Sequence, residues 1–356
     1  MSVFYHHNEV PPFKRPVITI GSFDGVHHGH KTILKEVVQV AKQVGGESVL
    51  ITFEPHPRKI IHPDLPLGLL TSPEQKIALI EAEGIDHIVV VPFTRDFSMM
   101  SAREYVEDFL LKCFAPHTII IGYDHRFGHS REGDIALLRK LAPASVAVKE
   151  IPAQLIEDAA VSSTKIRNAL LHGRIHEAAE MLERNYAYTA TVVHGNKIGR
   201  TIGYPTANLQ ATYADILIPG IGVYAVYVEW GKKLYKGMMS VGYRPTVTDE
   251  RVVTCEVNLL DFDGDLYGQI LMIHFAHYLR GEQKFDSLDQ LKGQIAQDEL
   301  RSRTMLYPVW GGRRPPPAPP TPDNPEKILY SCGHKDYAVW NEALWNTTRR
   351  TCLRAG

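Results

Sequence analysis

Two histidines three residues apart follow the first apolar run of the chain. Val17–Ile20 leads into Gly21-Ser22-Phe23-Asp24-Gly25-Val26-His27-His28-Gly29-His30, and a helical pattern starts directly afterwards. A glycine-rich turn at a helix start is an anion site, because free backbone N–H groups and the helix dipole face the ligand. His27 and His30 add imidazole donors, and Gly29 permits a close approach of the backbone to the ligand. The spacing predicts a phosphate site, with metal ligation and a purely structural turn as alternatives.

A second polar cluster, Val161-Ser162-Ser163-Thr164-Lys165-Ile166-Arg167, stands at the start of another helical pattern. Its three hydroxyls, ammonium and guanidinium would form the second half of the phosphate site. The alternative is an ordinary helix N-cap with solvated charges. Together with the histidine turn, the cluster resembles the signature of the nucleotidyltransferase superfamily, whose members move a nucleotidyl group from a nucleoside triphosphate.

A third segment, Gly199-Arg200-Thr201-Ile202-Gly203-Tyr204-Pro205-Thr206-Ala207-Asn208, combines glycines with a hydroxyl and an amide two residues apart. Glycines let the backbone close over a phosphate chain. Thr206 and Asn208 offer hard oxygen ligands for Mg²⁺. An ordinary turn between strands is the alternative. The sequence holds neither a Walker loop nor a protein-kinase catalytic loop.

Alternating strand and helix patterns must position the first two clusters. Between residues 15 and 185, short β-branched runs are separated by amphipathic stretches. This alternation predicts a doubly wound, Rossmann-like α/β domain with a parallel sheet buried on both faces. The predicted strands are Val17–Ile20, Ser48–Phe53, His87–Val91, Thr118–Ile121 and Ser145–Ile151, and the predicted helices are Lys31–Val44, Pro73–Glu83 and Ala102–Phe114.

The pattern changes near residue 186. Strand-like runs separated by Gly, Pro and Asp turns predict an antiparallel β-barrel. A helix, Ile175–Arg184, is predicted to bridge the two regions, and a final helix is predicted over Ser287–Met305. The predicted barrel strands are Tyr188–His194, Gly222–Trp230, Lys233–Val241, Val252–Leu260 and Gln269–Tyr278.

Composition narrows the class of protein. The 356 residues carry a net charge of −1, which disfavours binding of nucleic acid through a general basic surface. The sequence contains no run of about 18 apolar residues, so it predicts no membrane span. The four cysteines form no CxxC pair, which fits a reducing cytoplasm rather than a disulfide scaffold. The run Arg313–Pro322 is typical of an extended polyproline linker, so we expect residues 308–356 to be a loosely attached tail.

Four segments together resemble the FMN adenylyltransferase half of prokaryotic bifunctional FAD synthetase, and the barrel half resembles its riboflavin kinase. The segments are Gly21–His30, Thr52–Pro57, Gly122–Gly128 and Ser162–Arg167. The resemblance covers residues 15–307. It implies an adenylyltransferase domain at 1–185 and a kinase domain at 186–307, and it leaves the tail at 308–356 uncovered.

For the first domain, the resemblance implies transfer of AMP from ATP to FMN, giving FAD and pyrophosphate. His27 and His30 would be catalytic, contacting the phosphates around the reacting phosphorus. Asp124 would assist both nucleotide and flavin binding, and Phe127 would lie at the flavin. Gly21, Phe23, Gly29, Ser162, Ser163, Thr164 and Arg167 would complete the nucleotide and phosphate site.

For the second domain, the resemblance implies phosphorylation of riboflavin by ATP with Mg²⁺. A reacting alcohol needs a base, and the family places a catalytic glutamate at Glu256. Considered alone, this carboxylate would more often be a solvated strand residue. Gly199, Gly203, Thr206 and Asn208 would bind nucleotide, the last two also metal, and Arg280 would contact the flavin.

The sequence departs from the family pattern at Ser22, His125, Asn258 and Gly281, where Asn, Phe, His and Pro are usual. Two functional alternatives compete with this interpretation: another nucleotidyltransferase, such as a cytidylyltransferase or a tRNA synthetase relative, and a non-catalytic flavin-binding or regulatory protein. The barrel argues against the first, and the retention of Glu256, Thr206 and Asn208 argues against the second. We expect riboflavin, FMN and ATP as small-molecule partners; the oligomeric state does not follow from the sequence.

Overall fold

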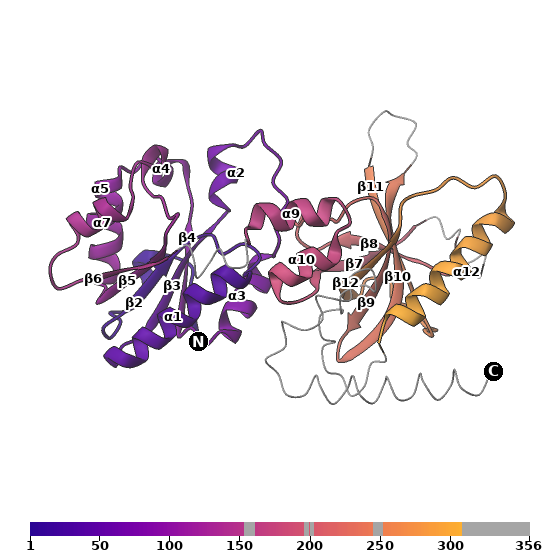
Figure 1. The fold of residues 1–356 in the computed structure, drawn as a ribbon, viewed down its shortest axis with the longest axis horizontal. Coiled ribbons are helices and arrows are strands. Elements are labelled where there is room, and N and C mark those ends of the chain that lie inside the picture. Colours follow the sequence, from indigo (N-terminus) through magenta and orange to yellow (C-terminus); the bar gives the residue numbers. More distant parts are fainter. Residues whose placement is uncertain (153–160, 196–198, 200–202, 245–251, 308–356) are drawn as a thin grey trace. The chain divides into compact units, whose positions relative to one another are not determined.

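A computed structural model describes residues 1–152, 161–195, 199, 203–244 and 252–307 (Figure 1). The described residues belong to one compact unit. None of their helices combines the length and the apolar character needed to cross a membrane. The predicted tail lies outside the described residues.

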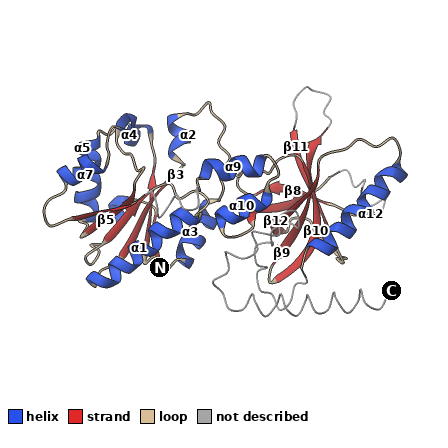
Figure 2. Cartoon of the chain, in the orientation of Figure 1, coloured by secondary structure: helices blue, strands red, loops and turns tan. Residues whose placement is uncertain are grey.

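Six parallel strands form the sheet of the N-terminal region, which Figure 2 draws in red with helices around it. Their spatial order is β1-β4-β3-β2-β5-β6, and every neighbouring pair is parallel. The order reverses at β2, whose neighbours β3 and β5 lead toward opposite edges. The strands are β1 (Ser2–Phe4), β2 (Val17–Ile20), β3 (Ser48–Glu54), β4 (His87–Pro92), β5 (Thr118–Gly122) and β6 (Ala147–Ile151).

Both faces of this sheet are buried. Val17 and Leu50 belong to one hydrophobic cluster with residues of α1, whereas Ile18 and Ile51 belong to another on the opposite face. Because successive strand residues point to opposite faces, this division confirms the predicted doubly wound arrangement. The helices are α1 (His28–Val44), α2 (Pro57–Ile61), α3 (Pro73–Ala82), α4 (Arg95–Ser98), α5 (Ala102–Glu104), α6 (Lys112–Phe114) and α7 (Ile135–Leu141). A π-helical stretch, Tyr105–Leu111, joins α5 to α6.

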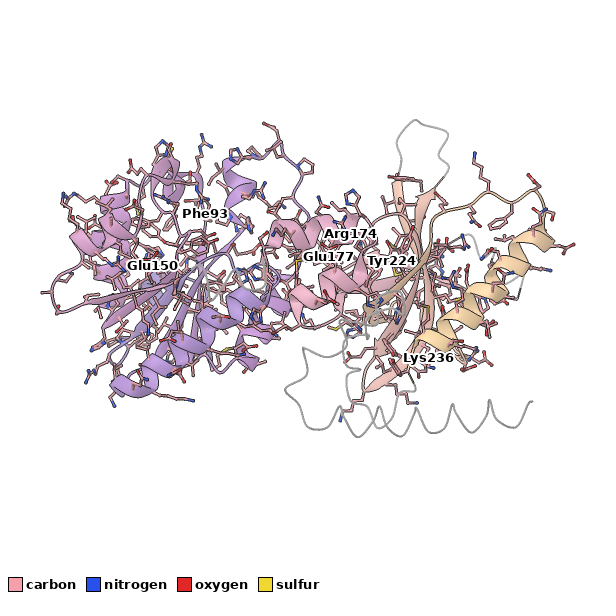
Figure 3. All side chains as sticks on the ribbon, viewed as in Figure 1. Phe93, Glu150, Arg174, Glu177, Tyr224 and Lys236 are labelled. Carbon is pink, nitrogen blue, oxygen red and sulfur yellow. The ribbon has the colours of Figure 1, made fainter. Side chains whose placement is uncertain are left out.

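Two helices, α9 (Ser163–Leu171) and α10 (Ile175–Leu182), lead into a closed barrel. The barrel order is β10-β11-β8-β7-β12-β9, and all its pairs are antiparallel. Large aromatic side chains fill its interior, among them Tyr224 and Phe275, both 0% exposed. Tyr224 is labelled on the barrel in Figure 3. The remaining elements are β7 (Tyr186–Val193), β8 (Ala207–Ala211), β9 (Gly222–Trp230), β10 (Lys233–Arg244), β11 (Val252–Leu259), β12 (Ile270–Arg280) and α12 (Leu288–Met305).

The structure adds two strands that the sequence patterns did not predict. β1 is three residues long and pairs only with β4 at the edge of the sheet. β8 follows the Pro205-Thr206 motif and lies between β7 and β11 in the barrel. Both are short and partly polar, so tertiary pairing rather than local propensity makes them strands. The predicted domain boundary after residue 185 stays a prediction.

Candidate active sites

The histidine turn occupies the point where the strand order of the parallel sheet reverses. The turn leaves the carboxyl end of β2 and enters α1, and the Gly122–Asp124 segment leaves the neighbouring end of β5. In open α/β sheets, ligands bind outside the carboxyl ends of the strands at such a reversal. α1 has 17 residues, so its N-terminal N–H groups and dipole favour an anion here.

His27 and His30 are stacked on each other at the start of α1. Their ring centroids are 3.7 Å apart, and the His30 backbone N–H donates to His27 Nδ1 over 3.4 Å. Burial, followed by the charge of Arg184, lowers the pKa of His27 to about 4. Burial and the adjacent His27 hold the pKa of His30 well below its ordinary value. Both imidazoles are therefore neutral near pH 7 and offer N–H donors rather than fixed charges.

Cationic side chains surround the neutral histidines. Arg167 and Arg184 both lower the pKa of His27, and Lys76 and Arg184 lower that of His30. Lys76 is buried, and its Nζ donates to Thr52 Oγ1 at 3.2 Å and to the Phe53 carbonyl at 3.4 Å. A site of this composition favours a polyanion, which would offset the concentrated positive charge.

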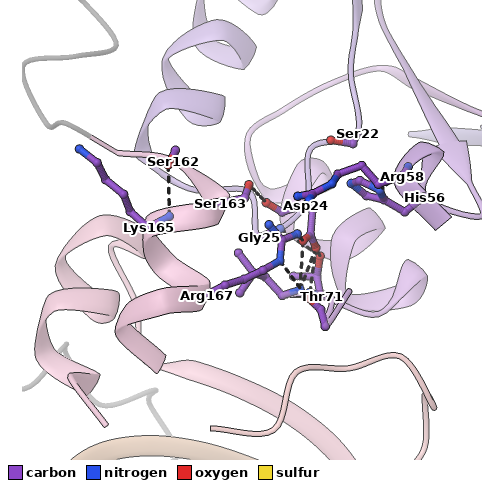
Figure 4. Close-up of polar contacts among 12 residues, drawn as sticks. Ser22, Asp24, Gly25, His56, Arg58, Thr71, Ser162, Ser163, Lys165 and Arg167 are labelled. Carbon is purple, nitrogen blue, oxygen red and sulfur yellow. Dashed lines mark hydrogen bonds and ion pairs between the residues drawn. The ribbon is translucent and has the colours of Figure 1, made fainter. Parts of the chain in front are cut away.

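Asp24 connects the histidine turn to two distant segments (Figure 4). Its carboxylate accepts hydrogen bonds from the backbone N–H groups of Leu70, at 2.9 and 3.1 Å, and of Thr71, at 3.2 Å. It also forms a close ion pair with Arg167 of α9. The Ser163 hydroxyl donates to the Asp24 carbonyl at 2.9 Å. The two sequence clusters predicted to share a phosphate site are thus joined directly.

The residues of the second polar cluster, Val161 to Arg167, have different surroundings. Ser162 caps α9, because its Oγ accepts from the Lys165 N–H at 3.2 Å, which agrees with the N-cap interpretation for this residue. Thr164 is exposed. Arg167 pairs with Asp24, and its Nε also donates to the Gly68 carbonyl at 2.7 Å.

The other residues predicted for the first site have mixed environments. Phe23 is buried, and its ring lies 5.0 Å from that of His30, while a side chain at Gly21 would press against Phe23. Gly29 is buried in the first turn of α1. Asp124 is exposed after β5, whereas Phe127 is buried and stacked on Tyr105 at 5.2 Å.

Thr206, Asn208 and Glu256 come together in the barrel. The Thr206 hydroxyl donates to Glu256 Oε2 at 2.9 Å. Glu256 on β11 lies directly opposite Asn208 on β8, so the two side chains share one face of the sheet. On its other side Glu256 is paired with Ser240 of β10. Glu256 is therefore a part of a polar cluster rather than an isolated strand residue.

Two glycines leave room for this cluster. A Cβ at Gly199 would lie 2.2 Å from the Tyr204 carbonyl oxygen, and one at Gly195 would lie 2.1 Å from Asn208 Nδ2. Gly203 has a φ of +87°, which favours glycine. The hydroxyl, amide oxygen and carboxylate collected here are hard oxygen donors, so the residues fit Mg²⁺. Arg200 to Ile202 of the predicted segment lie outside the described residues.

A cavity of about 580 Å³ opens beside Ser240. Its wall includes Arg280 of β12 together with Phe285, Leu288 and Leu291 from the start of α12 and the preceding loop. The Arg280 guanidinium is held by the buried Asp298, with Nη2 to Oδ2 at 2.8 Å.

Three groups in these sites were not predicted as site residues: Asp24, Lys76 and Arg184. Asp24 lay within the histidine segment, but its partners are 46 and 143 residues away along the chain. Lys76 and Arg184 lie within stretches of ordinary helical pattern, and nothing in these stretches indicates a function. In the described part of the chain, no group of three or more His, Cys, Asp or Glu side chains could hold a metal ion.

Two known families match successive parts of the chain, and each part contains residues of one of the two sites. The FAD synthetase family matches residues 11–165, and the riboflavin kinase family matches residues 182–306. The first match includes the histidine turn and ends at Lys165, two residues before Arg167. The second includes Thr206, Asn208 and Glu256.

Curated relatives are similar over nearly their whole length. The bifunctional riboflavin kinase/FMN adenylyltransferase of Listeria monocytogenes is 36% identical over 291 residues, which cover 82% of this chain and 92% of the relative. That of Escherichia coli K12 is 36% identical over 301 residues, covering 84% and 95%. A solved structure titled a macrolide-efflux protein from Streptococcus pneumoniae superposes with a TM-score of 0.77 at 32% identity, covering 85% of this chain and 98% of that one.

Proposed function

The chain belongs to the family of bifunctional riboflavin kinase/FMN adenylyltransferases, and we propose that its two reactions take place at the two clusters described above. The enzyme phosphorylates riboflavin with ATP to FMN and then adenylylates FMN with a second ATP to FAD and pyrophosphate. The assignment of reactions to residues rests mainly on one observation. The first family match contains the histidine turn, and the second contains Thr206, Asn208 and Glu256.

Adenylyl transfer in the N-terminal region requires alignment and charge neutralisation. A phosphate oxygen of FMN attacks the α-phosphorus of ATP, the bond from that phosphorus to the bridging oxygen breaks, and pyrophosphate leaves. FMN is already a nucleophile, so no covalent enzyme intermediate is needed. His27 and His30 donate N–H hydrogen bonds where charge accumulates. Arg167 and the start of α9 hold the triphosphate, while Asp124 and Phe127 lie toward the flavin.

Phosphoryl transfer in the barrel requires a base. The terminal ribityl hydroxyl attacks the γ-phosphorus of ATP, the bond to the β-phosphate oxygen breaks, ADP leaves, and Glu256 accepts the hydroxyl proton. The 2.9 Å hydrogen bond from Thr206 fixes one carboxylate oxygen of Glu256. Thr206 and Asn208 would hold Mg²⁺, which supplies screening of the phosphate charge when bound.

The cavity beside Ser240 is the proposed riboflavin pocket. Ser240 lines this cavity and is also the cross-strand partner of Glu256, so a hydroxyl at the inner end of the cavity would be close to the base. Phe285, Leu288 and Leu291 supply apolar surface for a flat ring system. Arg280 forms part of the wall, and its pairing with Asp298 makes it a rigid contact.

A cytoplasmic location is also proposed, because it fits ATP-dependent metabolic chemistry and the two free cysteines of the described residues, Cys113 and Cys255. A time course tests the function as a whole. The full chain is incubated with riboflavin, ATP and Mg²⁺, and the flavins are separated by chromatography. We expect FMN to appear first and FAD later, with CTP failing to replace ATP. Unchanged riboflavin and unchanged FMN would refute the proposed function.

A further inference from the structure

Two consecutive residues before β8 are held by side chains of β11. The Pro205 carbonyl accepts a hydrogen bond from Asn258 Nδ2 at 2.7 Å, and the Thr206 hydroxyl donates to Glu256 at 2.9 Å. The turn that carries Thr206 is therefore fixed by two neighbouring side chains of β11.

Asn258 and Glu256 are neighbours on one face of β11, because they are two residues apart on a strand. The ladder between β11 and β8 pairs Cys255 with Leu209, Glu256 with Asn208 and Val257 with Ala207. It ends there, one residue before Asn258. The side-chain amide of Asn258 thus makes the next connection between the two segments, where the backbone ladder has stopped.

The burial of Asn258 makes this connection energetically significant. Asn258 is 8% exposed, and a buried amide N–H that loses its acceptor carries an uncompensated desolvation cost. Pro205 has no backbone N–H, so its carbonyl is the group through which this residue can be tied to β11. The next residue along the chain is Thr206, whose hydroxyl reaches the carboxylate proposed as the base.

We propose that Asn258 is a positioning residue of the kinase site, which fixes the Pro205 carbonyl and thereby directs the Thr206 hydroxyl toward Glu256. The inference rests on the proposed kinase function of Thr206 and Glu256. Asn258 touches neither substrate nor metal in this scheme. It acts through the backbone of the turn, so its removal disturbs the reacting geometry more than substrate binding.

Three substitutions separate this role from a merely structural one. Asn258→Ala removes the amide, Asn258→Asp keeps the size but removes the donor, and Asn258→His retains a ring N–H. Misplacement of reacting groups by about 1 Å costs on the order of a hundredfold in rate. We therefore expect kcat for riboflavin phosphorylation to fall roughly ten- to a hundredfold in N258A and N258D, with the KM for riboflavin changing less than about threefold, and N258H to recover most of the loss.

The chain supplies its own controls. FMN adenylylation by the same preparation reports whether the variant is folded, and it should be unchanged. His274→Ala removes another buried polar contact of the barrel, the hydrogen bond to Glu229 on β9, which is not on β8 or β11. We expect it to lower Tm while leaving kinase kinetics unchanged.

Wild-type kcat in N258A or in N258D would overturn the inference, as would a loss in N258A that appears only in KM. If N258A does not fold, N258D, which matches the native side chain in size, decides the matter. Failure of the proposed kinase function is a separate result, because wild-type protein would then leave riboflavin unphosphorylated.

Discussion

Replacing Asp24 with asparagine should weaken both the fold and the adenylyltransferase site. The Asp24 carboxylate is 3% exposed and has Arg167 as its ionic partner, with hydrogen bonds from the N–H groups of Leu70 and Thr71. Removing one partner of a buried ion pair costs about 3–5 kcal/mol, since the other charge remains desolvated. Asparagine keeps the shape and one acceptor oxygen, so we expect a loss near the lower figure.

The measurements are thermal unfolding followed by circular dichroism and the steady-state rates of both reactions. A loss of about 3 kcal/mol should lower Tm by roughly 5–10 °C. FMN adenylylation should fall at least about tenfold, because Arg167 and the histidine turn are no longer joined. Riboflavin phosphorylation, whose residues lie in the barrel, should be unchanged at a temperature where the variant is folded.

Asp86→Asn is the matched control. Asp86 accepts hydrogen bonds from the N–H and hydroxyl of Ser48, at 2.9 and 2.7 Å, next to the amino end of β3. It has no arginine partner among the described residues, so its substitution should lower stability without lowering the rate of FAD formation. A D24N variant with wild-type Tm and adenylylation rate would contradict the proposed role of the ion pair. Equal losses of stability in D24A and in the double variant D24A/R167M would also contradict it, because the double variant leaves no uncompensated charge.

His27 has a folded-state pKa of about 4 against an ordinary value of 6.5, so the unfolded chain binds the proton first and the free energy of unfolding should fall as the pH decreases from about 6.5 to 4. Urea unfolding at several pH values should show a contribution of about 3 kcal/mol from His27 that is reduced in H27Q. An equal slope of unfolding free energy against pH in both proteins would contradict this expectation. A chain ending at Tyr307 should retain both activities, because the described fold extends to this residue: Leu306 is buried, and the Tyr307 N–H donates to the Tyr227 hydroxyl at 2.9 Å. Loss of either activity in the truncated chain would show that residues 308–356 contribute to that activity.

Much of the fold could be predicted from local patterns. Val17–Ile20 and Gly222–Trp230 form strands with the predicted bounds, because an apolar run and its flanking turns are both visible within a few residues. The parallel sheet and the barrel follow from how these runs alternate with helical patterns. β8 was missed because its Asn208 and Gln210 are polar, and its pairing with β7 and β11 outweighs that local signal.

The sites were predictable to the extent that their chemistry is local. The stacking of His27 on His30 follows from three-residue spacing at a helix start. The contacts that hold those residues are not local. Asp24 reaches Leu70 and Arg167, and Asn258 reaches Pro205 over 53 residues, distances along the chain at which composition and spacing give no indication. Such contacts appear only when the chain is folded.

Two separate sites are proposed to act in turn on the same flavin, and a pair of variants distinguishes them. His30→Ala and Glu256→Gln are each assayed with riboflavin and ATP, and again with FMN and ATP. We expect H30A to accumulate FMN without forming FAD, and E256Q to leave riboflavin unchanged while converting supplied FMN to FAD. A folded variant of either kind that loses both activities would contradict the account.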